Sequence, residues 1–250
     1  TDDLNRPCAQ IESGTEDTAI ALMDLSDSGI FFETKRHFAR DMVTGFIKLN
    51  GMTVGAVANR SKVYNDQAEV EAEFDGSLSA DGASKAAAFV EFCDAFNIPV
   101  LTLTNVSGFA ASKYDEMHLA KAAAKLTCAF ANATVPKVNV IMDKAFGTPY
   151  LAMNSKSVGA DMVYAWPQAR IGTMDPMMAA KIMYAGEELA VIRERAAEYS
   201  GLQESAKSSA GRGYVDTIIE PADTRKYVIG AFEMLFTKRE ERPLKKHGTV

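Results

Sequence analysis

The residues of this chain that could carry chemistry lie in two turns, each between an expected strand and an expected helix. The first turn is residues 105–109 (N-V-S-G-F), and the second is residues 144–149 (K-A-F-G-T-P). In a parallel α/β sheet such turns lie at the carboxyl ends of the strands, where ligands bind. A glycine there lets a ligand approach the backbone, and N–H groups at the start of the next helix favour a developing negative charge. The alternative interpretation is that these glycines only form turns.

Local signatures of side-chain catalysis are missing from the sequence. It has no G-x-x-x-x-G-K-[ST] phosphate loop, no H-E-x-x-H zinc motif and no G-x-S-x-G nucleophile elbow. His37, His118 and His247 have no second ligand at the spacing of a metal site, so we expect no metal. Gly211 and Gly213 lack the third glycine of a dinucleotide-binding fingerprint. A site in this chain would therefore work through backbone amides.

The composition is that of a folded globular domain. Of 250 residues, 47% are hydrophobic and 24% are charged, which excludes disordered, collagen-like and low-complexity classes. The net charge of −6, from 27 basic and 33 acidic residues, disfavours nucleic acid as a partner. No stretch is apolar enough to span a membrane, and the first residues lack the pattern of a secretory signal. Cys8, Cys93 and Cys128 are too scattered for a disulfide framework or a metal site, so we expect reduced thiols and a cytoplasmic location.

The elements that would hold the two turns alternate between strands and helices. Two apolar runs at 42–49 and 52–59, joined by Asn50-Gly51, predict a β-hairpin, because both turn positions require a positive φ. Ser79 or Asp81 is the expected N-cap of a helix at 82–96. The other expected strands are 100–106, 138–143, 162–165, 169–173 and 214–219, and the other expected helices are 117–133, 150–157, 177–184, 187–199 and 222–238.

Three stretches have weaker patterns. Residues 31–38 are compatible with a short helical turn, residues 62–78 read as an irregular acidic surface segment, and residues 1–17 read as a polar lead-in. No linker, repeat or break in composition divides the chain. The alternation of strands and helices predicts a single α/β domain with a largely parallel sheet.

Several segments together resemble the biotin-dependent acyl-CoA carboxyltransferases, the family of the propionyl-CoA carboxylase β-subunits and the related biotin-dependent decarboxylases. They are residues 82–100 (GASKAAAFVEFCDAFNIPV), 133–138 (ATVPKV), 164–167 (YAWP), 213–224 (GYVDTIIEPADT) and 242–247 (RPLKKH). The resemblance runs in the right order over almost the whole chain, and it covers the C-terminal half of the usual two-half subunit. Residues 2–6 (DDLNR) are similar to the linker at which that half begins.

The resemblance implies a crotonase/ClpP-like superhelix of ββα units. It implies that residues 1–250 are a single carboxyltransferase domain of the C-terminal type, with 1–17 as lead-in or linker. In that family the active site lies at a dimer interface, where the N-terminal half of one subunit holds most of the coenzyme A thioester. The C-terminal half of the other subunit receives carboxybiotin.

The resemblance also implies partners, because the chain has no A-M-K-M biotin acceptor and no ATP-grasp pattern. Biotin would arrive on a carrier domain or chain other than this one. The implied partners are an N-terminal carboxyltransferase half, a biotin carboxyl carrier protein and a biotin carboxylase, and the implied assembly is a homo-oligomer. We expect the isolated chain to be inactive, because half of each active site is missing.

In the mechanism that the resemblance implies, carboxybiotin releases CO2 and backbone amides stabilise the biotin enolate. Biotin then takes the α-proton of the acyl-CoA, and the acyl enolate attacks CO2. The implied catalytic residues are Gly147, Thr148 and Pro149, because the two amides expected to face the biotin carbonyl oxygen fall on Thr148 and Pro149. The implied cofactor-binding residues are Ser107, Gly108 and Phe109, and the implied substrate-binding residues are Tyr150, Leu151, Met174 and Asp175.

Three turns depart from the usual family pattern. K-A-F-G-T-P-Y at 144–150 replaces the common K-A-Y-G-G-A-Y, N-V-S-G-F at 105–109 replaces D-x-P-G-F, and G-T-M-D-P at 172–176 replaces small residues and glycine after methionine. Proline has no N–H, so Pro149 removes one expected donor unless the amide of Gly147 or Tyr150 replaces it. Asp175 would add a charge near the pocket, and an apolar Leu151 suits a short acyl chain.

Three functions stay open at this stage. The first is the carboxyl-transfer half-site of a biotin-dependent acyl-CoA carboxylase or transcarboxylase. The second is the same half in a biotin-dependent acyl-CoA decarboxylase. The third is a catalytically degenerate assembly subunit, which Pro149 and Asp175 favour. The sequence names neither the acyl group nor the size of the oligomer.

Overall fold

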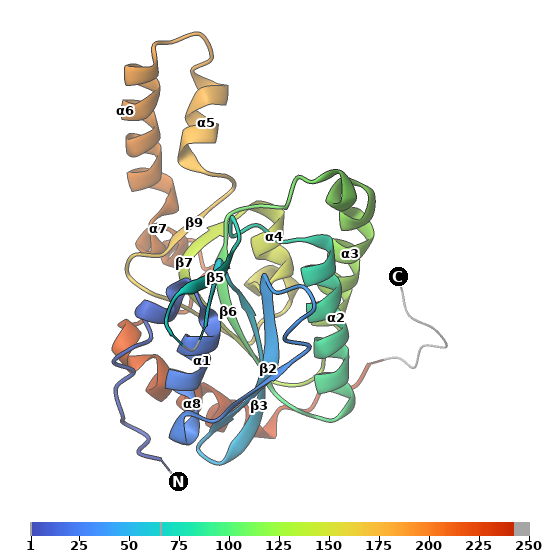
Figure 1. The fold of residues 1–250 in the computed structure, drawn as a ribbon. Helices are drawn as coiled ribbons and strands as arrows, with labels where there is room; N and C mark the ends of the chain where they lie inside the picture. The colour runs from blue at the N-terminus through green and yellow to red at the C-terminus, as the bar shows by residue number, and fades with distance from the viewer. Residues whose placement is uncertain (1, 66, 243–250) are drawn as a thin grey trace.

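A mostly parallel, eight-stranded sheet forms the centre of the computed structural model, which describes residues 2–65 and 67–242 (Figure 1). Its strands lie in the order β1-β2-β3-β6-β7-β8-β10, with β9 paired to β7. The pairs β1–β2 and β2–β3 are antiparallel, and all other pairs of this sheet are parallel. The strands are β1 (Phe31–Thr34), β2 (Met42–Leu49), β3 (Met52–Asn59), β6 (Val100–Val106), β7 (Lys137–Phe146), β8 (Met162–Ala165), β9 (Arg170–Gly172) and β10 (Thr217–Ile218).

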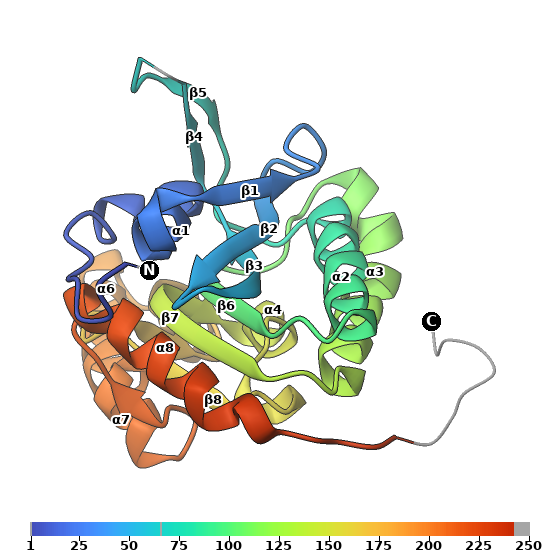
Figure 2. The same cartoon turned by 90° about the horizontal axis from the view of Figure 1, so that it is seen from below.

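Helices cover both faces of the sheet and give the molecule three layers (Figures 1 and 2). One apolar core lies between the sheet and α2 (Ala80–Ala95), α3 (Lys113–Asn132) and α4 (Gly147–Ala152). The second lies between the sheet and α1 (Thr18–Leu25) and α8 (Thr224–Met234). The helices α5 (Pro176–Met183) and α6 (Leu189–Tyr199) form a hairpin that projects from the body, and α7 (Ala206–Gly211) follows it.

The predicted α/β class with a largely parallel sheet is confirmed, and several local predictions hold in detail. The hairpin β2–β3 turns through Asn50 and Gly51, whose φ angles are 51° and 77°. Ser79 is the N-cap of α2 and accepts a hydrogen bond from the amide of Gly82. The strand predicted at 100–106 has these bounds in the structure. Within the described residues, no helix is long and apolar enough to cross a membrane.

Other local predictions are wrong. Residues 31–34 form a strand and not a helical turn, because they pair with residues 44–47 of β2. The segment predicted as irregular contains a second hairpin of β4 (Lys62–Tyr64) and β5 (Val70–Glu73). The helices α1 and α7 were not predicted, and α3 begins at Lys113 and not at 117. In the polar lead-in, Cys8 and Ile11 are buried in the core under α1 and α8.

Candidate active site

A cavity of about 460 Å³ lies beside the ends of β7 and β9, at the carboxyl edge of the parallel sheet. The first helix after β7, α4, lines it with Gly147, Thr148, Tyr150 and Leu151. These are four of the residues that the resemblance assigns to catalysis and substrate binding. The volume falls within the ~300–1,000 Å³ range of small-molecule sites. The cavity is therefore the candidate active site of this chain.

The position of Gly147 explains why glycine is needed where β7 passes into α4. Its φ is +66°, a left-handed conformation that side chains rarely adopt. A Cβ atom at this position would also lie only 3.1 Å from the carbonyl oxygen of Thr173. The backbone of Gly147 thus packs closely against the segment that leaves β9. α4 begins at this residue.

Pro149 is the third residue of α4 and is buried. The first helical positions have no carbonyl acceptor inside their helix, so proline fits there without breaking a helical hydrogen bond. The fourth position is the first whose N–H bonds back within the helix, and Tyr150 occupies it. Of the two residues expected to donate to the biotin carbonyl oxygen, Thr148 is thus the one that has an N–H.

Tyr150 and Leu151 give the cavity an apolar wall. Tyr150 is 5% exposed, and burial, together with the nearby Tyr214, raises the pKa of its phenol to about 12. The hydroxyl is therefore uncharged near neutral pH. Leu151 is 39% exposed. Tyr150 thus gives the cavity a buried surface, whereas Leu151 and Thr148 are open to solvent.

Met174 and Asp175 are not among the residues that line this cavity. Asp175 is the N-cap of α5, and its carboxylate accepts hydrogen bonds from the amides of Met177 at 2.9 Å and Met178 at 3.3 Å. A carboxylate at a helix N-terminus is stabilised by the free amides and the helix dipole. The structure thus gives Asp175 a local structural role at the base of the projecting hairpin.

Ser107, Gly108 and Phe109 follow β6, the neighbour of β7, so both predicted turns lie at the same edge of the sheet. This turn is tied to residues 75–78. The amide of Ser107 donates to the carbonyl of Gly76 at 3.0 Å, and the amide of Leu78 donates to the carbonyl of Gly108 at 2.8 Å. None of the three residues lines the cavity described above. Their assignment to cofactor binding stays a prediction.

The opposite wall of the cavity comes from residues that the sequence analysis does not assign to the site. Ile171, Gly172 and Thr173 belong to β9 and the residues that follow it, and further lining residues lie more than forty positions after α4. These are Tyr199, Gln203, Ser209, Arg212 and Tyr214. Signals were available in the sequence: Gly172 and Thr173 belong to the turn at 172–176, and Tyr214 lies in the segment at 213–224 that carries the resemblance.

The described histidines lie outside the candidate active site. His37 and His118 are exposed, and His118 stacks on Tyr114 while its Nδ1 lies 2.8 Å from the carbonyl oxygen of that residue. His247 lies outside the described residues. Within 2–65 and 67–242, no three His, Cys, Asp or Glu side chains are grouped to hold a metal ion.

Glu204 is a buried carboxyl group next to the cavity wall. It is 0% exposed, and neither of its carboxyl oxygens has a hydrogen-bond partner within the described residues. A Cβ atom on Gly172 would lie 3.0 Å from its Cγ atom. Burial raises the pKa of Glu204 above the ordinary 4.5, and Asp175 adds to the rise. The nearby Ser200 hydroxyl and Arg170 oppose it without completing a hydrogen bond in this geometry.

We expect Glu204→Gln to stabilise the chain at pH 7 by about 1 kcal/mol, since the ionised carboxylate is buried without a partner. A folded-state pKa above the unfolded value means that the native state binds the proton more tightly, so stability falls as pH rises through this window. The gain should therefore shrink toward pH 4. Urea denaturation of both proteins between pH 4 and pH 8 measures it, and an equal effect at both ends would contradict the assignment.

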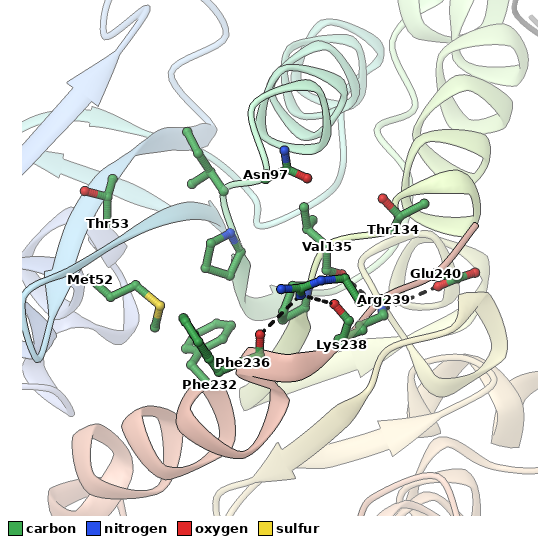
Figure 3. Close-up of a pocket in the computed structure, with 13 residues that line it drawn as sticks. Met52, Thr53, Asn97, Thr134, Val135, Phe232, Phe236, Lys238, Arg239 and Glu240 are labelled. Atoms are coloured by element: carbon green, nitrogen blue, oxygen red, sulfur yellow. Dashed lines mark hydrogen bonds and ion pairs between the residues drawn. The ribbon is translucent and has the colours of Figure 1, made fainter. Parts of the chain in front are cut away.

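A second cavity, of about 620 Å³, lies at the opposite edge of the sheet, where Pro99 and Pro136 precede β6 and β7 (Figure 3). The basic side chains that line this cavity already have an ion-pair or hydrogen-bond partner. Lys238 pairs with Asp161 at 2.9 Å, and the Arg239 guanidinium donates to the carbonyl of Lys238 at 2.7 Å. None of the residues assigned from the sequence lies here. The cavity at the carboxyl edge is therefore the better candidate.

Comparison with known proteins agrees with this fold. The family model of the carboxyl transferase domain matches residues 13–250. The chain is 42% identical to a putative propionyl-CoA carboxylase beta chain of Bacillus subtilis (strain 168), over 99% of this chain and 48% of that protein. It is 38% identical to the methylmalonyl-CoA decarboxylase subunit alpha of Propionigenium modestum, over 90% of this chain and 43% of that protein.

A solved structure of a related protein has the same fold. The crystal structure of transcarboxylase 12S, described as a hexamer assembly with methylmalonyl-coenzyme A and methylmalonic acid bound, matches 100% of this chain and 48% of its own. The TM-score is 0.90 and the sequence identity 37%. This chain belongs to the carboxyl transferase family, and the crotonase-like fold expected from its sequence is confirmed. It spans about half the length of the curated relatives that it matches.

Proposed function

We propose that this chain is the carboxyl-transfer half-site of a biotin-dependent acyl-CoA carboxylase or transcarboxylase. The observation that carries the proposal is the placement of Thr148 at the start of α4, in the wall of a cavity at the carboxyl edge of the sheet. In this proposal residues 1–250 act as one domain of the C-terminal type. It works with an N-terminal carboxyltransferase half, a biotin carboxyl carrier protein and a biotin carboxylase.

The residues present fit a ureido or thioester oxygen. The cavity offers an N–H donor at Thr148 and an uncharged phenol at Tyr150, beside the apolar Leu151. Carboxybiotin, when bound from its carrier, would supply CO2 for transfer to the acyl-CoA. The amide of Thr148 would donate to the oxygen on which negative charge develops. A backbone donor of this kind contributes roughly 3–4 kcal/mol when it is well placed.

Pro149 limits this site to one of the two expected donors. A single amide gives weaker stabilisation than a pair, so we expect slower turnover than a site with both N–H groups. The position remains compatible with the fold, because proline is tolerated in the first turn of a helix. Pro149 is also the feature that favours the third function, a degenerate assembly subunit.

A decarboxylase is the second candidate. It is favoured by the 38% identity to a methylmalonyl-CoA decarboxylase subunit alpha. A decarboxylase would use the same amide and the same cavity with the transfer running toward biotin. The two activities are therefore distinguished by the partner subunits and not by this half-site.

We expect the chain alone to be inactive and to show biotin-dependent decarboxylation of malonyl- or methylmalonyl-CoA once an N-terminal carboxyltransferase half from the same source is added. The assay follows loss of the CoA thioester with free biotin, with and without the second half. Turnover by the pure chain would contradict the half-site assignment. A stable complex by size-exclusion chromatography that turns over neither thioester would instead favour the assembly subunit.

A further inference from the structure

Arg212 is a cation of the candidate active site that has no acidic partner. It lines the same cavity as Thr148 and Tyr150, and it is the charged side chain among the described lining residues. None of the ion pairs found within residues 2–65 and 67–242 involves it. Arg212 is exposed to solvent, and a positive charge beside a cavity lining that is otherwise uncharged favours an anionic ligand.

Neutral groups hold the guanidinium of Arg212 in place. Its Nη2 atom shares two hydrogens among three acceptors: the carbonyl oxygen of Gln203 at 2.7 Å, the Oε1 atom of Gln203 at 3.1 Å and the Oγ atom of Ser208 at 2.6 Å. The Nε and Nη1 atoms have no hydrogen bond within the described part of the chain. The group is thus oriented before a ligand binds, with two nitrogen atoms left to donate. Such preorganisation reduces the entropy that binding costs.

The other walls of the cavity suit a carboxylate on a small apolar group. Leu151, Ile171 and Tyr214 supply apolar contact surface, and no acidic side chain lines the cavity within the described residues. The two carboxyl groups at the base of the hairpin do not compete for the guanidinium. Asp175 accepts the amides of α5, and neither Asp175 nor Glu204 forms an ion pair with Arg212 within the described residues. An Arg–carboxylate hydrogen bond is charge-assisted and stronger than a neutral one.

The second cavity also contains a guanidinium without an ion pair within residues 2–65 and 67–242, that of Arg239. There the Lys238 ammonium group is paired with Asp161, and Nη1 of Arg239 donates to two backbone carbonyls, those of Phe236 and Lys238 (Figure 3). Arg239 therefore provides a matched control, because it carries the same charge at the mouth of a cavity on the other edge of the sheet.

We propose that Arg212 is a specificity-determining residue that binds the carboxylate of a carboxylated ligand in the active-site cavity. This inference rests on the proposed function. Two ligands of that reaction have the required chemistry. One is an acyl-CoA whose acyl group has a free carboxylate, and the other is the carboxylated biotin of the carrier. Their uncarboxylated counterparts lack the group that Arg212 recognises.

The first arm of the test measures calorimetric binding of methylmalonyl-CoA and propionyl-CoA to the chain combined with an N-terminal half. These two probes differ by one carboxylate. We expect Arg212→Gln to weaken methylmalonyl-CoA binding about tenfold to hundredfold and to leave propionyl-CoA binding unchanged. Arg212→Lys keeps the charge and should lose less, and Arg239→Gln should bind both probes like wild type. This arm requires no turnover, so it remains informative if the proposed function fails.

The second arm measures the other source of carboxylate. The KM for a carboxylated biotin carrier is determined in transfer to propionyl-CoA. A rise of about tenfold or more for Arg212→Gln, with unchanged binding of both CoA thioesters, assigns the recognised carboxylate to the carrier. An equal loss for propionyl-CoA and methylmalonyl-CoA would show that Arg212 only supports the fold and would overturn the proposal. Unchanged values in both arms would overturn it as well.

Discussion

Thr148→Pro is expected to lower biotin-dependent carboxyl transfer by a factor of about 100 or more, because it removes the amide that the proposed mechanism places at the developing oxyanion. Pro149 already lacks an N–H, so the variant would have two consecutive residues without a donor at the start of α4. The loss should appear in kcat and kcat/KM together, since the hydrogen bond strengthens as negative charge develops. Steady-state kinetics of the complex with the N-terminal half measure it.

The fold should survive this change. Residue 148 is the second position of α4, where an N–H has no acceptor inside the helix and where proline is accepted. The matched control is Thr148→Ala, which removes the hydroxyl and keeps the amide, and it should retain nearly all activity. A proline variant that transfers at the wild-type rate would exclude the amide of Thr148 from catalysis. Equal losses in both variants would instead assign the effect to the side chain.

Arg225→Met is expected to lower the free energy of unfolding by about 3–5 kcal/mol, because it leaves a partly buried carboxylate without its cation. Arg225 lies in α8 and is 0% exposed. Its Nη2 atom donates to Asp27 at 2.6 Å, and its Nη1 atom donates to the carbonyl oxygen of Leu25 at 2.5 Å. Chemical denaturation at pH 7 measures the loss.

The expected loss is large because Asp27 connects three parts of the fold. Its carboxylate also accepts the amides of Asn50 at 3.2 Å and Gly51 at 2.7 Å, so it joins α8 to the turn of the β2–β3 hairpin. The control is Arg195→Met, which breaks an exposed pair with Glu198 and should change stability by less than about 1 kcal/mol. Similar losses of unfolding free energy in the two variants would show that burial does not increase the contribution of the Arg225–Asp27 pair to stability.

Local chemistry was enough to predict part of the fold. An Asn-Gly pair between two apolar runs specifies a two-residue turn, and the structure has that hairpin. The strand at 100–106 and the helix capped by Ser79 follow from patterns within a single stretch of chain. Each of these elements depends on neighbours in the sequence, which is why it can be read before the structure is known.

The elements that were missed depend on distant partners. Residues 31–34 form a strand because the edge of β2 offers its backbone, and their own pattern does not demand it. The strand β5 of the second hairpin is mostly exposed and acidic, so it has no clear apolar alternation to reveal it. The helix α1 packs its buried residues against a core that also contains residues of α8, about 200 positions later.

The residues of the candidate site also fall into those that local sequence predicts and those that only distant packing brings together. Local patterns predicted the family, the α/β class and the turn 147–151, because this turn is continuous in the chain and carries its own departures from the family pattern. The other wall of the cavity depends on packing between distant segments. This packing brought Arg212 and Tyr214 to face α4, and it placed Asp175 at the start of α5 instead of in the cavity. These positions depend on how β9 and the hairpin fold back, and such packing between distant segments leaves no local pattern in the sequence.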